Sequence, residues 1–280
     1  MATLFKKVVI VGAGYMGFQI GSQIAEHEVL VVLVDTNTKL VEKIQAESDS
    51  AYLSATTSLP EAVSDCDLVI ESITENLRIK QNFFHSLEGM VAEDVVLVTN
   101  SSMLLPSKIA RKLHKKDRFC GFHFYAPALG ANLVDVSPIK QTAPAVADQL
   151  TQFAVETGFE PVRLKKENYG YIQNYLFDGV NERAFSLLLR GVATVEDIDK
   201  SFRIVTGASA GPFQMMDTVG LDVVLHIVRN KARRKPATWL VVPLLKRYVS
   251  AGKLGVKSGE GFYHYEEGYE VPHVGEKLRA

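Results

Sequence analysis

Cysteine is scarce in this chain. Only Cys66 and Cys120 occur among its 280 residues, and they lack the partner spacing of a metal site. We therefore expect no disulfide framework and no bound metal, with both thiols in the core. The chain also has no excess of charge of one sign, since its net charge is -1. It therefore has no general electrostatic attraction to nucleic acid. No apolar run reaches the roughly 18 residues of a membrane span, so we expect a cytoplasmic protein without membrane or nucleic-acid partners.

Two segments allow a second interpretation, one as a signal peptide and one as a binding site for a phosphate-bearing ligand. Residues 1–10 contain a short apolar stretch, but it enters a glycine turn instead of a signal-peptide cleavage site, so we interpret it as a strand. The basic run 231–235 is typical of a solvated helix end. Binding of a phosphate-bearing ligand by this run is the alternative.

The first part of the chain alternates short β-rich runs with amphipathic helical stretches. This rhythm predicts an α/β fold of Rossmann type, a doubly wound and mostly parallel sheet covered on both faces. The last two predicted strands are expected to flank a helix over Pro144–Thr157 and to extend the sheet at its edge. The predicted strands are Val8–Val11, Val31–Val34, Leu68–Ile70, Val95–Val98, Phe119–Phe122, Asn132–Val136 and Glu160–Leu164.

The pattern changes near Gly170 to long segments with a helical period, at about 170–190, 195–205, 212–229 and 237–251. This predicts a smaller all-α domain. We place the boundary at the polar connector Lys165–Asn168, which gives a nucleotide-binding domain over 1–166 and a helical substrate and dimerisation domain over 167–280.

A glycine turn follows the first predicted strand and opens a helix. Its glycines are Gly12, Gly14 and Gly17, and Asp35 ends the next strand. The first glycine permits the tight turn, the second allows backbone to approach a pyrophosphate, and the third allows helix to pack on strand. The helix N-terminus then faces the phosphate charge. This context predicts a dinucleotide site.

Asp35 sets the expected cofactor. A carboxylate here accepts hydrogen bonds from the adenosine ribose hydroxyls and repels a 2′-phosphate, which favours NAD over NADP. The alternative is that Asp35 caps the helix that follows.

Several motifs together resemble the 3-hydroxyacyl-CoA dehydrogenase family. They occur in the family's order over nearly the whole chain, and the most specific is Arg118–Pro127, which contains His123. The other matching segments are Val69–Leu77, Thr99–Ser102, Gly170–Asn174, Gly211–Phe213 and Lys253–Phe262.

The resemblance implies four catalytic residues. His123 would be the acid and base, a role that suits an imidazole whose ordinary pKa of about 6.5 allows proton exchange near neutrality. Asp135 would be its carboxylate partner, at a place where most members have Glu, and an exposed strand carboxylate is the alternative. Ser101 and Asn174 would hold the reacting oxygen and the acyl carbonyl. The alternatives are a helix cap for Ser101 and a solvent-facing or interhelical amide for Asn174.

The resemblance also places Glu75 and Lys80 on the nicotinamide side of the cofactor, although a charge pair on a helix surface is the alternative for these two. The full set of residues expected to bind NAD is Gly12, Gly14, Tyr15, Met16, Gly17, Asp35, Glu75, Lys80 and Asn100.

The sequence departs from the family pattern between Asp35 and Glu71. Members usually insert a projecting helix pair there that helps to hold coenzyme A, but residues 36–70 provide room only for a helix from Lys39 to about Glu47, a short strand near 51–53 and a helical turn at 60–63. Ala126 stands where Asn is common. Thr99-Asn100 also reverses the Asn-Thr order that family members usually have before the serine. Together these departures look more like a branch of the family that includes diketoreductases.

Three functions follow as hypotheses. The first is NAD-dependent interconversion of 3-hydroxyacyl and 3-oxoacyl compounds, most readily an acyl-CoA such as 3-hydroxybutyryl-CoA in fatty acid metabolism. The second is the same reaction on a free acid or ester. The third is a non-catalytic NAD-binding protein of crystallin-like or redox-sensing type. The resemblance also implies a homodimer.

Overall fold

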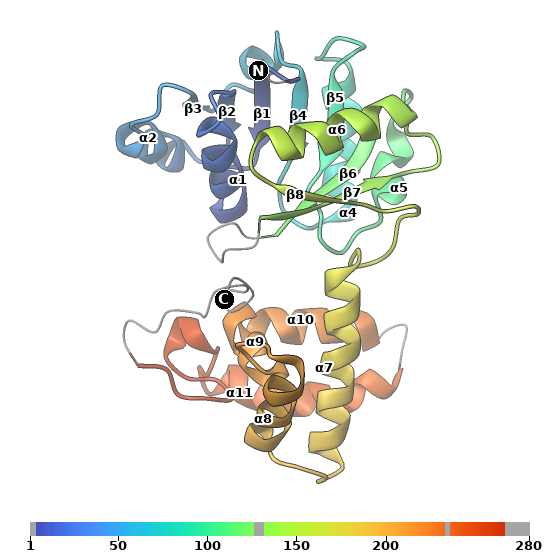
Figure 1. Ribbon diagram of the computed structural model, residues 1–280. Helices are drawn as coiled ribbons and strands as arrows, with labels where there is room; N and C mark the ends of the chain where they lie inside the picture. The colour runs from blue at the N-terminus through green and yellow to red at the C-terminus, as the bar shows by residue number, and fades with distance from the viewer. Residues whose placement is uncertain (1–3, 126–131, 233–235, 267–280) are drawn as a thin grey trace. The chain divides into compact units, whose positions relative to one another are not determined.

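The computed structural model describes residues 4–125, 132–232 and 236–266. The chain divides into two compact units, Met1–Ile172 and Gln173–Ala280, and each is described by itself (Figure 1).

An eight-stranded sheet forms the first unit, in the order β3-β2-β1-β4-β5-β6-β7-β8. All neighbouring pairs are parallel except β6 and β7, which run antiparallel. The predicted Rossmann-type α/β fold is confirmed. The strands are β1 (Lys7–Val11), β2 (Leu30–Val34), β3 (Leu53–Thr56), β4 (Leu68–Glu71), β5 (Val96–Thr99), β6 (Phe119–Phe124), β7 (Leu133–Pro138) and β8 (Glu160–Arg163).

Helices cover both faces of this sheet. One apolar core lies between the sheet and α1 (Tyr15–Ala25), α2 (Thr38–Glu47) and α6 (Pro144–Glu156), and Figure 1 shows α6 lying across that face. A second core lies under α3 (Leu59–Val63), α4 (Leu77–Glu88), α5 (Pro106–Ile109) and η1 (Ala110–Lys112). Because both faces are covered, every residue of β4, β5 and β6 is buried.

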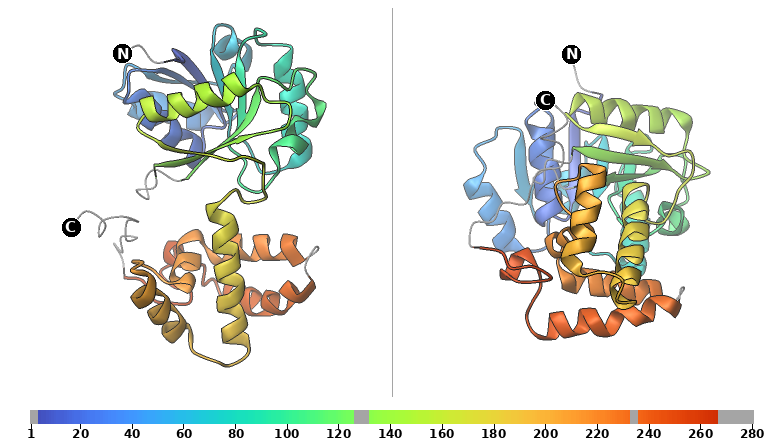
Figure 2. Two further views of the ribbon diagram at one scale, coloured as in Figure 1. Left: turned by 45° about the vertical axis from the view of Figure 1, so that its right-hand side comes forward. Right: turned by 60° about the horizontal axis from the view of Figure 1, so that its bottom comes forward.

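The second unit is helical, as predicted, and its longest helix α7 (Gln173–Leu189) runs along α8 (Val195–Thr206) and α9 (Pro212–Val219) (Figure 2). The other elements are α10 (Leu221–Ala232), η3 (Pro236–Val241), α11 (Val242–Ser250) and η4 (Val256–Ser258). Two buried carboxylates organise this unit. Asp199 accepts the backbone N–H groups of Phe213 and Gln214 at the start of α9. Asp217 accepts those of Phe262 and Tyr263.

Several predicted element bounds differ from those of the structure, and three of the differences are as follows. The strand expected near 51–53 is β3, Leu53–Thr56. The helix expected over 212–229 is two helices, because Gly220 has φ +98°, a left-handed conformation that ends α9. The segment expected as one helix over 237–251 begins as η3 and continues as α11.

Two other expectations hold, one for residues 36–70 and one for the two cysteines. Only α2, β3 and α3 lie between β2 and β4, a stretch that the structure describes throughout, so the projecting helix pair is missing, as predicted. Both cysteines are buried and free, and burial raises the pKa of Cys66 to about 11 and of Cys120 to about 12. Among the described residues no helix is long and apolar enough to cross a membrane. Ala126 and residues 233–235 of the basic run lie outside the described residues.

Candidate active site

The glycine turn between β1 and α1 has the shape that a dinucleotide requires. Gly12 has φ +103°, and a Cβ there would lie 2.4 Å from the Ser72 carbonyl oxygen. A Cβ on Gly17 would lie 1.9 Å from the Gly12 carbonyl oxygen, so helix and turn are in direct backbone contact. Gly14 differs, because a Cβ there would meet no atom within 4 Å. The packing of the protein itself therefore requires glycine at positions 12 and 17. The space beside Gly14 is left open for a ligand.

Gly14 is also the N-cap of α1, and no side chain caps the helix. The first amide groups of an α-helix have no acceptors within the helix and carry partial positive charge, so they can bind a phosphate group. Beside them, Tyr15 is exposed and Met16 is half-buried against the core.

Asp35 supports the turn from the end of β2. Its carboxylate accepts the Ala13 N–H at 2.9 Å and the Asn37 N–H at 2.9 Å. The N-cap of α2 is Asn37, whose side chain accepts the Leu40 N–H, so Asp35 does not have the capping role. Asp35 remains half-buried, and each carboxylate oxygen has a further lone pair for a ribose hydroxyl. The glycines and Asp35 therefore fit NAD.

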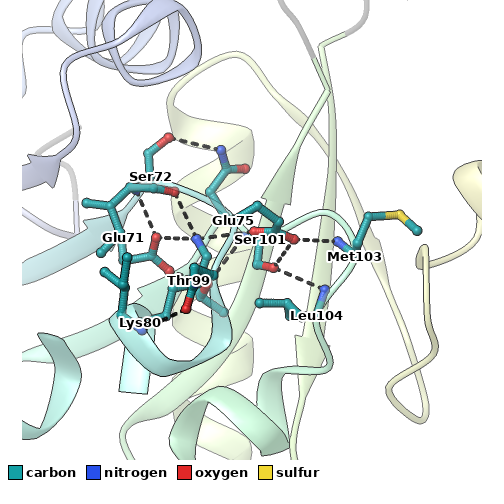
Figure 3. Close-up of polar contacts among 12 residues, drawn as sticks. Glu71, Ser72, Glu75, Lys80, Thr99, Ser101, Met103 and Leu104 are labelled. Atoms are coloured by element: carbon teal, nitrogen blue, oxygen red, sulfur yellow. Dashed lines mark hydrogen bonds and ion pairs between the residues drawn. The ribbon is translucent and has the colours of Figure 1, made fainter. Parts of the chain in front are cut away.

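A buried ion pair lies behind the ends of β4 and β5 (Figure 3). The Nζ atom of Lys80 is 2.5 Å from Oε1 of Glu71, and these side chains are 1% and 0% exposed. Glu71 also accepts the Thr99 hydroxyl at 2.6 Å and the Ile73 N–H at 2.9 Å. Burial raises the pKa of the Glu71 carboxyl, and the Lys80 ammonium opposes this rise. Lys80 is thus not a helix-surface residue.

Glu75 connects this pair to Ser101, as Figure 3 shows. Its Oε2 is 3.3 Å from Lys80 Nζ, and its Oε1 accepts the Ser101 hydroxyl at 2.6 Å and the Met103 N–H at 2.9 Å. The Ser101 Oγ accepts the Leu104 N–H at 3.2 Å. Ser101 is not the cap of the next helix, since the N-cap of α5 is Leu105. Its hydroxyl has a fixed direction in a buried turn.

Asn100 links two strand ends. Its side-chain amide donates to the Ser72 hydroxyl at 3.3 Å, and its carbonyl oxygen accepts the Phe124 N–H at 2.9 Å. These bonds place Asn100 between the β4 loop and β6, the strand that carries His123.

His123 and Asp135 face each other on neighbouring antiparallel strands, where they are register partners. Both are buried, so Asp135 is not an exposed strand carboxylate. His123 Nδ1 is 3.7 Å from Asp135 Oδ2, which is too long for a hydrogen bond. Within the described part of the chain, neither His123 Nδ1 nor Asp135 Oδ1 has a hydrogen-bond partner. The two residues are therefore buried side by side without a direct hydrogen bond.

Two tyrosines surround this histidine. The Tyr125 hydroxyl donates to Asp135 Oδ2 at 2.8 Å, and its ring meets the imidazole edge to face. Tyr171 stacks on the imidazole with centroids 4.5 Å apart and planes inclined by 9°. Sequence reasoning missed both. The two-residue spacing on one strand face could have indicated Tyr125, whereas no local pattern marks Tyr171.

The predicted site residues are therefore partly assembled. Asn100, Ser101, His123 and Asp135 lie at the ends of β5 and β6 and on β7, Glu75 lies in the loop after β4, and Lys80 lies on α4. Asn174 is half-buried in the first turn of α7, in the second unit. Among the described residues no group of three or more His, Cys, Asp and Glu side chains can hold a metal.

Family models match nearly the whole chain. The model for "3-hydroxyacyl-CoA dehydrogenase, NAD binding domain" matches residues 7–53 and 43–168, and that for its C-terminal domain matches residues 170–265. The mouse mitochondrial hydroxyacyl-coenzyme A dehydrogenase is 32% identical over 94% of this chain and 92% of its own. The 3-hydroxybutyryl-CoA dehydrogenase of Clostridioides difficile is 31% identical over 93% and 100%.

Solved structures agree with these matches. A diketoreductase structure has a TM-score of 0.85 and 33% identity, covering 95% of this chain and all of the other. An (S)-3-hydroxybutyryl-CoA dehydrogenase from Ralstonia eutropha has a TM-score of 0.81 and 29% identity, covering 94% and 100%. The chain belongs to the 3-hydroxyacyl-CoA dehydrogenase family and is an NAD-dependent oxidoreductase that acts on a CH–OH group.

Proposed function

We propose that the protein interconverts 3-hydroxyacyl and 3-oxoacyl compounds, with His123 as acid and base and Asp135 as its partner. One observation carries this proposal, the buried and in-register placement of the two residues, with 3.7 Å between Nδ1 and Oδ2. They lie at the end of the sheet where β4 and β5 also end, and open α/β sheets bind ligands outside the carboxyl ends of their strands.

Bound NAD supplies the acceptor for the hydride that leaves the carbinol carbon. In that direction His123 takes the hydroxyl proton on Nε2, and Nδ1 faces Asp135. The imidazolium that forms is stabilised by the buried carboxylate, an interaction that a low-dielectric site strengthens. In reduction the same nitrogen returns the proton.

Ser101 and Asn174 are proposed to orient the substrate. The Ser101 hydroxyl is fixed by Glu75 and by the Leu104 N–H, so its oxygen occupies a defined place for a substrate oxygen. The Asn174 amide would hold the acyl carbonyl. Because both residues position and polarise without exchanging the proton, we expect each to affect rate without abolishing the reaction.

The catalytic assignment is tested by following NADH absorbance with 3-hydroxyacyl substrates. A general base usually contributes about 10²–10⁴-fold, so His123→Gln should lose at least 100-fold in kcat. His226→Gln is the matched control, because His226 is exposed on α10, where its ring forms a hydrogen bond with Asn230. Retention of more than about a tenth of wild-type turnover by His123→Gln would refute the assignment.

The substrate is proposed to be an acyl-CoA, with 3-hydroxybutyryl-CoA the first to try, since dehydrogenases named for such substrates are about 30% identical. A free 3-hydroxy acid or ester is the second candidate, because residues 36–70 lack a projecting helix pair and a diketoreductase has a similar fold. The ratio of kcat/KM for 3-hydroxybutyryl-CoA and free 3-hydroxybutyrate decides between them. A clear preference for the CoA ester excludes the second.

A non-catalytic NAD-binding role is the alternative of another class. It would need the glycine turn and Asp35 but not a buried His–Asp pair. NADH binding without turnover across a panel of 3-oxo substrates would favour it.

We also propose a cytoplasmic homodimer that acts in fatty acid metabolism. Trp239 and Leu240 expose 51% and 71% of their surfaces in the second unit, and we expect a second copy of the chain to cover them. Sedimentation should show a dimer at micromolar concentration, and cell fractionation tests the compartment.

A further inference from the structure

Two tyrosines contact the imidazole of His123 from different directions. The ring of Tyr171 lies parallel to it, at 9° and 4.5 Å. The ring of Tyr125 meets it at 78° and 4.6 Å. A stacked ring fixes the plane of the imidazole, and an edge-on ring limits its rotation within that plane.

Each tyrosine hydroxyl reaches a different residue of the candidate site. Tyr125 donates to Asp135 Oδ2 at 2.8 Å. Tyr171 donates to the Ser101 carbonyl oxygen at 2.9 Å, across 70 positions of sequence. The imidazole is therefore connected through one phenol to its carboxylate and through the other to the serine turn.

The backbone at Tyr171 is arranged at a cost. Tyr171 has φ +52° and follows Gly170 with φ +72°, and a left-handed conformation costs a residue other than glycine roughly 1–2 kcal/mol. Asn168 stabilises the turn, since its carbonyl accepts the Tyr171 N–H and its side chain donates to the Tyr171 carbonyl. The tyrosine is only 2% exposed, and burial raises its pKa well above the ordinary value, so its hydroxyl remains a donor.

We propose that Tyr125 and Tyr171 are positioning residues for the proton transfer. Tyr171 holds the imidazole plane and the Ser101 turn in one relation, and Tyr125 holds the Asp135 carboxylate facing Nδ1. The proposal rests on the function proposed above, in which His123 carries the proton. Simple core packing would not require that both hydroxyls end on residues of the same site.

The titratable groups that contact His123 are Asp135 from β7, Tyr125 from β6 and Tyr171 from the segment before α7. Glu75 and Cys120 lie close enough to influence the Tyr171 hydroxyl. These groups give each substitution a distinct expected effect on the pH dependence.

Tyr125→Phe removes the donor from Asp135 and leaves its charge more available to the imidazolium, so the acidic limb of kcat/KM for oxidation should move to higher pH. Tyr171→Leu removes an aromatic face that stabilises a cation, so the same limb should move to lower pH. Tyr171→Phe keeps that face and loses only the bond to Ser101. It should lower kcat by roughly 3–20-fold, with KM and the pH profile unchanged.

The experiment measures kcat, KM and their pH dependence by NADH absorbance for the three variants. Tyr52→Phe, at a partly exposed tyrosine before β3, is the matched control and should equal wild type. Tyr171→Phe also covers the case that Tyr171→Leu fails to fold. Equal pH profiles for Tyr125→Phe, Tyr171→Leu and wild type would overturn the proposal, as would a Tyr171→Phe effect confined to KM.

A second readout separates this proposal from the proposed function. The His123 ring signals in a nuclear magnetic resonance titration, assigned with His123→Gln, do not depend on turnover. If wild-type protein turned over no 3-hydroxyacyl substrate, the proposed function would fail. The positioning proposal would still stand if Tyr125→Phe and Tyr171→Leu shifted the His123 titration in opposite directions, and it would fail if neither did.

Discussion

The buried pair of Glu71 and Lys80 allows a sharp test of what holds the site together. Lys80→Met keeps the length and apolar stem of the side chain but removes the ammonium, 2.5 Å from Glu71 Oε1. The Glu71 carboxylate, with none of its surface exposed, then keeps only the Thr99 hydroxyl and the Ile73 N–H. Water cannot replace the lost partner without entering the core.

Removing one partner of a buried ion pair costs about 3–5 kcal/mol, because the remaining charge is not compensated. With an m-value of about 3 kcal/mol/M for a protein of this size, the urea midpoint should fall by roughly 1–1.7 M. Circular dichroism follows the unfolding, and Trp239, the chain's single tryptophan, reports on the second unit.

A surface pair gives the control. Lys43 and Glu47 are 3.9 Å apart on α2 with 65% and 66% of their side chains exposed, so Lys43→Met should cost no more than about 0.5 kcal/mol. Adding Glu71→Gln to Lys80→Met removes the unpaired charge, and the double variant should regain more than half of the lost stability.

The pH dependence fixes the sign of the effect. Burial raises the pKa of the folded Glu71 carboxyl above its ordinary value, and loss of the ammonium that opposes this should raise it further. Between the unfolded and folded pKa values the folded state binds more protons, so the stability of Lys80→Met rises as the pH falls through that window. The gap to wild type should therefore be smaller at pH 5 than at pH 8. A loss below about 1 kcal/mol, or a gap independent of pH, would refute the reasoning.

Three further predictions concern the glycine turn and Asp35. Gly17→Ala places a Cβ 1.9 Å from the Gly12 carbonyl and should destabilise the first unit or prevent its folding, whereas Gly179→Ala, in open space on α7, should stabilise by about 0.5–1 kcal/mol in thermal melts. Gly14→Ala should fold normally but bind NADH at least tenfold more weakly by fluorescence titration, and wild-type affinity would show that no phosphate approaches there. Asp35→Asn should reduce the NAD-over-NADP ratio of kcat/KM, and an unchanged ratio would count against its ribose role.

Much of the first unit could be predicted from the sequence because its signals are local. The buried parallel strands are short apolar runs bounded by glycine or polar residues, and the amphipathic helices repeat at a helical period. Strand β3 was harder, because Leu53–Thr56 pairs on one side only, lies at the sheet edge and is half polar. The break at Gly220 depends on one left-handed residue inside a helical pattern, and such a glycine is otherwise tolerated.

Part of the candidate site could likewise be predicted from local sequence signals, and part could not. The glycine turn and Asp35 are marked by spacing, and His123 by the motif Arg118–Pro127, through which the sequence resembles the family. The bond from Tyr171 to Ser101 spans 70 positions, and the pair of Glu71 and Lys80 depends on how α4 packs beside β4. These contacts result from tertiary packing, which no period or spacing in the sequence encodes.

Among the residues that the structure describes, two of the buried polar atoms without a hydrogen-bond partner belong to the same pair, His123 Nδ1 and Asp135 Oδ1. Folding alone disfavours such atoms, because each buried and unsatisfied group costs about 1–3 kcal/mol. Nearby, the Tyr125 hydroxyl satisfies the other Asp135 oxygen, so donors are available in this region. A carboxylate fully bonded to neutral donors would have less charge to offer an imidazolium. If His123 carries the proton, as proposed, the incomplete bonding of Asp135 leaves its charge available to the imidazolium, and this is a physical reason for a residue pair that stability alone disfavours.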